Sequence, residues 1–216
     1  SLSSQAKGQL GALYEEQQRY SEALSLTEQA IIDAQQIASD DLLLKWQWQS
    51  GRLLKALGKR KAAISAYRQT IYYINAIRGD IPISYQGGHS SFRETLSPIY
   101  TELADLLLQQ ATVVAKTSVA KTSAAKMSNN SSSLNKNKQI EKEQALLREA
   151  RDTIEQIKLS EFQDYFQNPC IVSRTEKLET LAPQTAVLYP IILADRLELL
   201  VSIGTKLTRY STVVSK

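Results

Sequence analysis

Small and apolar residues recur along this chain at a spacing of forty residues. Four pairs of positions keep this offset: Gly11 and Gly51, Ala23 and Ala63, Leu24 and Ile64, Ile31 and Ile71. A fixed period of this length is typical of repeat proteins, in which each unit is one small group of helices or strands. The pattern predicts two stacked pairs of antiparallel helices in the first eighty residues.

A third and more divergent unit is predicted after the second. Its first helix is expected near residues 92–111 and its second near residues 138–160, where apolar residues recur at helical spacing: Leu146, Leu147, Ala150, Ile154 and Ile157. Residues 79–91, with Pro82 and two adjacent glycines, are predicted to be the loop between units. Residues 1–166 are therefore expected to form one helical domain.

The pattern changes after residue 166. Residues 167–184 are interpreted as a linker, in which Pro183 blocks helix formation. Two apolar runs follow at 186–193 and 197–203, and the polar pair Asp195-Arg196 between them is typical of a β-hairpin. Gly204 precedes a candidate third strand at 207–213. A sheet of only two or three strands is marginally stable alone. Its apolar faces therefore need a partner sheet or helices.

Positive charge is concentrated in one segment. The 216-residue chain has 26 basic and 22 acidic residues, but residues 112–138 contain five lysines and no acidic residue, and without them 21 basic residues face 22 acidic ones. Three similar five-residue steps begin at Ala115, Ala120 and Ala125 and indicate growth by duplication. With few large apolar residues, the segment is predicted to be a disordered Lys/Ser-rich insertion, and a lysine-rich docking tail is the alternative.

Residues 4–160 resemble tetratricopeptide repeats. The matching residues of the first unit are Leu10, Gly11, Tyr14, Tyr20, Ala23 and Ala30, and those of the second are Gly51, Leu54, Gly58, Ala63 and Tyr67. In that family, small residues such as Gly11 and Ala23 let the two helices of a unit lie close together. Gly58 suits the tight turn between helices, because glycine adopts positive φ without penalty. The resemblance implies a mainly α fold, a right-handed superhelix of antiparallel helix pairs followed by a short β-hairpin. An unrelated helical bundle is the alternative.

The resemblance also implies a concave face that binds protein ligands. On the first helix of the second unit, this face includes Lys45, Trp48, Arg52 and Lys55. An arginine fork and an aromatic anchor are typical of interface hot spots, and together with the lysines they suit an acidic or C-terminal peptide. The alternative interpretation is a solvated face with Trp48 packed between units.

The C-terminal region is similar to CHAT-domain proteins, which are common in filamentous bacteria and especially in cyanobacteria. The matching residues are 147–155, 161–166 and 186–199, the last of which begins Ala-Val-Leu-Tyr-Pro-Ile-Ile-Leu. In that family the hairpin opens a caspase-like α/β domain, whose later dyad lies in His-Gly and Ser-Ala-Cys contexts. Neither context occurs in this sequence. The resemblance implies that residues 185–216 are the truncated start of such a domain, with its active site beyond Lys216.

The residues that carry chemistry are few. His89 and Cys170 are the only histidine and the only cysteine, and no glycine-rich oxyanion loop adjoins Cys170, so we expect an ordinary thiol and no catalysis by this chain. One histidine and one cysteine do not suffice for a zinc site, and no glycine motif for phosphate binding is present. We therefore expect no metal and no cofactor.

These observations together predict a protein–protein interaction scaffold with a protein or peptide ligand on its concave face. The alternative is a helical nucleic-acid-binding protein that uses the lysine-rich segment, but no aromatic residues are interleaved with those lysines. No apolar run reaches the roughly eighteen residues of a membrane span, and the N-terminal residues do not resemble a signal peptide. We therefore expect a cytoplasmic protein with no membrane partner.

Overall fold

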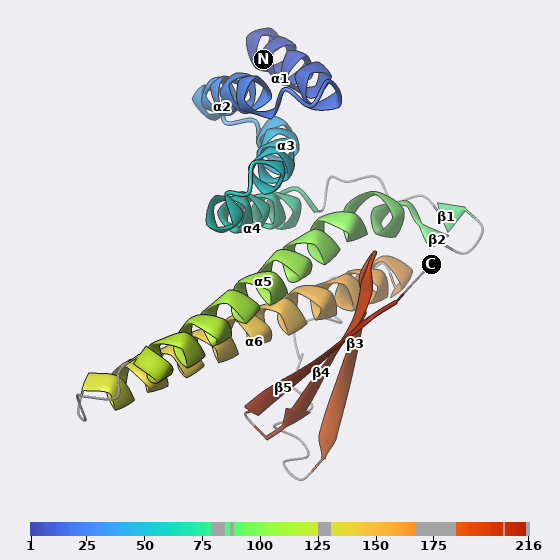
Figure 1. The fold of residues 1–216 in the computed structure, drawn as a ribbon. Coiled ribbons are helices and arrows are strands. Elements are labelled where there is room, and N and C mark those ends of the chain that lie inside the picture. Colours follow the sequence, from blue (N-terminus) through green and yellow to red (C-terminus); the bar gives the residue numbers. More distant parts are fainter. Residues whose placement is uncertain (79–84, 87–88, 125–130, 167–184, 205, 215–216) are drawn as a thin grey trace. The chain divides into compact units, whose positions relative to one another are not determined.

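The computed structural model describes residues 1–78, 85–86, 89–124, 131–166, 185–204 and 206–214. This part of the chain is mainly helical, with a small antiparallel sheet near its C-terminal end (Figure 1). The chain divides into two compact units, Ser1–Leu106 and Leu107–Lys216.

The first unit begins with two helix pairs. Helix α1 (Leu2–Glu16) packs along α2 (Tyr20–Gln36), and α3 (Asp40–Ala56) packs along α4 (Arg60–Ala76). Helix α2 also packs against α3, so the second pair is stacked on the first. Helices α2 and α4 begin forty residues apart, at Tyr20 and Arg60. The helix pairs predicted from the forty-residue period are confirmed.

Each connection between these four helices is a three-residue turn with one residue at positive φ. The residues are Gln18, Ala38 and Gly58, with φ of 59°, 48° and 71°. In every turn the following N–H donates to a carbonyl five residues back, which closes the helix end with a Schellman motif: Arg19 to Tyr14, Ser39 to Ala34 and Lys59 to Leu54. The turn predicted at Gly58 is confirmed, and two residues with side chains adopt the same conformation elsewhere.

Small residues let the paired helices lie close together. A Cβ atom added at Gly11 would lie 3.2 Å from the carbonyl oxygen of Ala23, which confirms the close approach predicted there. A Cβ at Gly51 would lie 2.8 Å from the ring of Tyr67. The residue nearest to Gly51 is therefore Tyr67 and not Ala63, because the large ring reaches across the contact between the helices.

Two long helices extend into the lysine-rich segment, one from each side. Helix α5 runs Ser91–Ala124 and α6 runs Ser131–Phe166, so the helices predicted at 92–111 and 138–160 are present and extend further. The prediction of a disordered insertion at 112–138 is wrong for residues 112–124 and 131–138, which are helical. Alanine and lysine have high helix propensity, so this composition can prolong a helix that apolar residues have begun. Residues 125–130 lie outside the described part.

A pair of two-residue strands precedes α5, within the segment predicted as a loop. Strand β1 (Tyr85–Gln86) pairs antiparallel with β2 (His89–Ser90). The other residues of that loop before position 89, and the linker predicted at 167–184, lie outside the described residues.

The C-terminal residues form a three-stranded antiparallel sheet in the order β3-β4-β5. The strands are β3 (Ala186–Ile192), β4 (Arg196–Ile203) and β5 (Lys206–Val213). The predicted hairpin is thus only part of this sheet, because the chain turns back again at Gly204, with φ of 57°, and β5 pairs along all of β4. The candidate third strand is confirmed.

Large apolar side chains lie on both faces of this sheet. Buried residues on one face include the charged Glu198 together with Tyr189, Leu200 and Leu207. The opposite face carries exposed large apolar side chains, namely Leu188, Ile192, Ile203 and Tyr210. An antiparallel sheet with one face in water normally has its polar residues on that face. The exposed face of this sheet therefore has the composition of a buried surface.

Candidate peptide-binding site

The four residues predicted to bind a peptide lie along one stripe of α3. Lys45, Trp48, Arg52 and Lys55 are separated by three, four and three positions, which places them on the same helical face. Both lysines are exposed, whereas Trp48 and Arg52 are partly buried. The stripe thus has an aromatic ring and a guanidinium at its centre and a lysine at each end.

Arg52 already has a carboxylate partner within the chain. Its Nε and Nη2 atoms donate to the two carboxylate oxygens of Glu15 on α1, each at 2.8 Å. Burial acts to lower the pKa of Arg52, but the hydrogen bonds and charge of Glu15 outweigh it, so the pKa is raised. The guanidinium also lies 4.9 Å from the centre of the Trp48 ring, a cation–π distance. Arg52 therefore holds the ring in place and is less open to a ligand than the sequence suggested.

The indole nitrogen of Trp48 is buried and has no hydrogen-bond partner among the described residues. An unpaired buried donor costs about 1–3 kcal/mol. The side chain as a whole is only partly buried, so the ring borders solvent. On α3, this donor has the most to gain from an acceptor supplied by a ligand.

Trp46, and not Trp48, is the tryptophan that joins the two repeat units. It is fully buried, and a Cβ atom at Gly8 would lie 2.4 Å from its ring, so only glycine fits below it. Its Nε1 donates to Ser4 Oγ at 3.0 Å, and that hydroxyl donates to the carbonyl of Ala30 at 2.7 Å. The repeat pattern in the sequence did not single out Trp46.

A buried glutamine makes a second polar link between the same units. Gln49 Nε2 donates to the carbonyl of Gly8 at 3.1 Å and to Thr27 Oγ1 at 2.8 Å. Trp46, Gln49 and the fully buried Leu53 lie three and four positions apart. That spacing was the signal in the sequence for a buried stripe on α3, adjoining the stripe that carries Trp48.

A second acidic residue lies near Arg52. The hydroxyl of Tyr67 donates to Glu102 Oε2 on α5. Burial, together with the hydrogen bond and charge of Glu102, raises the pKa of Tyr67, so the phenol stays protonated. The charge of Glu102 also contributes to the raised pKa of Arg52. The centre of the α3 stripe is thus partly neutralised from within the chain.

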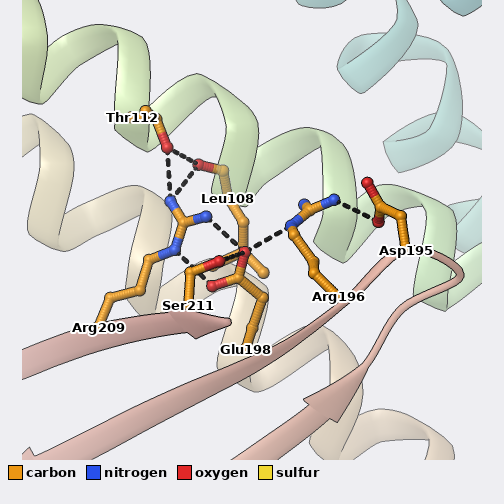
Figure 2. A network of polar contacts seen from close by, with 7 residues as sticks. All are labelled: Leu108, Thr112, Asp195, Arg196, Glu198, Arg209 and Ser211. Atoms are coloured by element: carbon orange, nitrogen blue, oxygen red, sulfur yellow. Dashed lines mark hydrogen bonds and ion pairs between the residues drawn. The ribbon is translucent and has the colours of Figure 1, made fainter. Parts of the chain in front are cut away.

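In the second compact unit, Leu107–Lys216, Glu198 is a buried carboxylate (Figure 2). Nothing in the sequence pattern had singled it out. Arg196 Nε donates to it at 2.6 Å, Arg209 donates through Nε at 2.8 Å and Nη2 at 2.5 Å, and Ser211 Oγ donates at 3.1 Å. Arg209 also donates to the carbonyl of Leu108 and to Thr112 Oγ1, at 2.8 and 2.6 Å. The network fastens the sheet to α5.

The bonding of Glu198 indicates a structural role. Four donors use the roughly four acceptor positions of a carboxylate, so none remains for a substrate or a metal. Burial acts to raise the pKa of Glu198, but hydrogen bonds from Arg209 and Arg196 outweigh it and hold the pKa below its ordinary value. The group is therefore an ionised anchor.

His89 and Cys170, the two residues considered as a catalytic pair, belong to none of the side-chain contacts described above. His89 lies in β2, where it pairs with Gln86, and Cys170 lies outside the described residues. Within the described ranges, no cluster of three or more histidine, cysteine, aspartate or glutamate side chains is placed to hold a metal ion. Within the same ranges, no helix combines the length and apolar content needed to cross a membrane.

The sequence matches no model of a known protein family, and it has no match among the curated proteins or the solved structures. The tetratricopeptide and CHAT resemblances are therefore carried only by the residues quoted for them.

Proposed function

We propose that this protein is an interaction scaffold whose α3 stripe binds an extended acidic segment of a partner protein. The observation that carries the proposal is the buried, unpaired indole N–H of Trp48, which lies between two exposed lysines on one helical face. A peptide carbonyl or carboxylate would accept from this N–H after a small rotation of the indole, still packed on Arg52, brings the nitrogen to the surface. Acidic side chains on either side of that acceptor would lie near Lys45 and Lys55.

The dimensions of the stripe suit a short peptide. Lys45 and Lys55 are ten positions apart, about 15 Å along a helix. Four or five residues of extended chain cover about that distance. The pair of Arg52 with Glu15 supports binding indirectly, since it holds the Trp48 ring in one orientation and lowers the entropy lost when a ligand is bound.

The wider architecture of the proposal is a tetratricopeptide-like, right-handed superhelix of helix pairs. The stacking of α2 on α3 and the three-residue turns support it. Following the CHAT resemblance, we also propose that the array holds proteins for a caspase-like domain, and that the described repeats bind without catalysing a reaction.

The test is a binding measurement with pooled decapeptides of acidic, neutral and basic composition, labelled for fluorescence anisotropy. The acidic pool is expected to bind best, and Trp48→Phe, which keeps a ring but removes the donor, should weaken it about tenfold. Ile32→Ala, at an exposed position of α2, serves as the control and should leave binding unchanged. Equal binding of all three pools would contradict the proposal.

A nucleic-acid ligand is the second candidate, and one observation favours it. The lysine-rich segment is helical at 112–124 and at 131–138, so Lys116, Lys121, Lys136 and Lys138 are carried on helices. Titration with a generic single-stranded oligonucleotide at two salt concentrations separates the candidates. Strong, salt-dependent binding that Trp48→Phe does not affect would favour the nucleic acid.

A further inference from the structure

Helix α1 has an apolar stripe that nothing in the described part of the chain covers. Leu2, Ala6, Gln9 and Leu13 are all exposed, with 81% of Leu2 and 53% of Leu13 accessible. They lie four, three and four positions apart, on one face of the helix. Leu10, also exposed, lies beside them. Contiguous exposed apolar residues of this kind are typical of interaction surfaces.

In the second repeat unit, the equivalent stripe lies on α3 and is covered by other parts of the chain. Forty residues further on, the equivalent positions of α3 are Leu42, Trp46, Gln49 and Leu53. Trp46 and Leu53 are fully inaccessible there. The covering surface is the first helix pair, since Leu53 packs with Ala23 and Leu24, and Leu42 and Trp46 pack with Ala30 and Ala34.

The covering helix has a recognisable composition. Helix α2 buries Ala23, Thr27, Ala30 and Ala34, which lie four, three and four positions apart. Small residues at this spacing leave room for the larger side chains of α3, which is how two helices pack at a short distance. An occupant of the α1 stripe that follows this example would be a helix with a similar small-residue stripe.

We propose that the exposed stripe of α1 is the docking surface for a further repeat unit of the same forty-residue kind. The second helix of that unit would lie along residues 2–13 as α2 lies along α3, which continues an interface already present in the molecule. Because Ala6 stands where α3 has Trp46, that helix would carry a larger residue opposite Ala6 than the alanines of α2. The surface is separate from the α3 stripe, so this proposal goes beyond peptide binding.

The physical reason is the behaviour of stacked repeats. Each unit buries its apolar face only against a neighbour, and an end unit is soluble when its outer face is polar. Leu2 and Leu13 on the outer stripe of α1, with Leu10 beside them, do not fit a polar end. The same leucines fit an internal position in an array, as Leu53 does in α3.

The test extends the full chain with a copy of residues 1–40 placed ahead of Ser1, so that the added unit stands where the proposal puts a neighbour. In this copy the residue equivalent to Ala30 is leucine, which fills the space opposite Ala6. In the original chain, Leu13→Ala should lower the melting temperature by less than about 2 °C, because the side chain is exposed. In the extended chain the same change should lower it by about 5 °C or more, and Leu53→Ala should do so in both chains.

Ile32→Ala is the matched control, because Ile32 is as exposed as Leu13 but lies outside the stripe. It should have a small effect in both chains. The proposal is overturned if Leu13→Ala is equally mild in both chains, or if the extension adds no helical circular dichroism. It is also overturned if the original chain sediments as a dimer that Leu13→Glu converts to a monomer, because a second copy would then occupy the stripe.

Discussion

Single residues in the helix turns hold a backbone conformation that suits glycine better than other amino acids. Ala38 has φ of 48° and an exposed side chain. A left-handed conformation costs an L-residue about 1–2 kcal/mol, and glycine avoids this at an entropic cost of about 0.5–1 kcal/mol. Ala38→Gly should therefore raise the free energy of unfolding by about 0.5–1 kcal/mol, measured by urea titration.

Gly58→Ala is the reciprocal substitution at the next turn. A Cβ atom there would meet no other atom within 4 Å, so only the backbone conformation opposes the change. Gly58→Ala should lower the free energy of unfolding by about 0.5–1 kcal/mol. Changes of the same sign at Ala38 and Gly58 would show that the turns are not strained as described.

The anchor at Glu198 gives a prediction about stability and pH. Glu198→Gln removes the negative charge between two arginines in a buried site and should cost about 3 kcal/mol at neutral pH. Since the folded pKa of Glu198 is lowered, its contribution is present above the ordinary carboxyl pKa of 4.5 and is lost as pH falls through the folded pKa. The stability difference between the two proteins should therefore shrink as the pH falls below about 4.5.

Ser211→Ala is a suitable comparison, because it removes one neutral donor to Glu198 and leaves both arginines. It should cost about 1 kcal/mol and leave the pH dependence in place. A Glu198→Gln protein whose deficit is the same at acidic and neutral pH would contradict an ionised anchor.

Some of the residues that stabilise the turns, the sheet and the repeat contact could be identified from the sequence, and others could not. Gly58 was predictable because positive φ is a local property that glycine reveals. Glu198 was not, since a charged residue in a strand is ordinarily placed in solvent, and its arginine partner Arg209 comes from the next strand. Trp46 was overlooked because Trp48 lies on the stripe that the tetratricopeptide resemblance emphasised.

At the scale of elements, the contact between α1 and α3 depends on a glycine beneath a tryptophan. Gly8→Ala would place a carbon 2.4 Å from the Trp46 ring and should cost about 1–3 kcal/mol through overpacking. Trp46→Leu should cost about 3 kcal/mol by leaving a cavity. The double variant should be more stable than the sum of the two losses implies by at least about 1 kcal/mol, because leucine makes room for the added methyl group.

These free energies of unfolding are measured by urea titration of the two single variants and the double variant. If the two losses simply add in the double variant, Gly8 and Trp46 do not compete for the same space. Gly58→Ala combined with Trp46→Leu is the control pair. Gly58 lies in a turn with no neighbouring atoms, so these two losses should add.

The existence of the elements was easier to predict than their limits. Periodic apolar positions fixed the first four helices and the start of α5. The ends of α5 and α6 were missed because the segment near Lys116 and Lys121 has few large apolar residues, whereas the helices continue there on alanine and lysine. The third strand was only a candidate, since its polar residues give a weak strand pattern and its pairing with β4 is a tertiary property.

At the scale of the whole molecule, Glu15 occupies the Arg52 guanidinium that the proposed acidic ligand would otherwise contact. Glu15→Gln keeps an amide oxygen that can accept from Arg52, so the guanidinium stays over the Trp48 ring, but it removes the carboxylate charge. Arg52 is then available for a charge-assisted contact with the ligand, and the affinity for acidic decapeptides should rise about tenfold. Glu16→Gln, an exposed neighbour on α1, changes the net charge equally and should raise affinity much less. If the affinity rises equally in both variants, the change in net charge explains the gain and the release of Arg52 does not.

Exchanging the charges at the two ends of the α3 stripe tests most directly whether this stripe binds acidic peptide as proposed. Lys45→Glu combined with Lys55→Glu should abolish measurable binding of the acidic decapeptide pool at about 0.1 M salt, since two attractions become repulsions. Lys59→Glu combined with Lys61→Glu makes the same change in net charge at exposed positions outside the stripe and should retain most of the binding. If both double variants lose binding to the same extent, or if neither does, the α3 stripe is not the binding site.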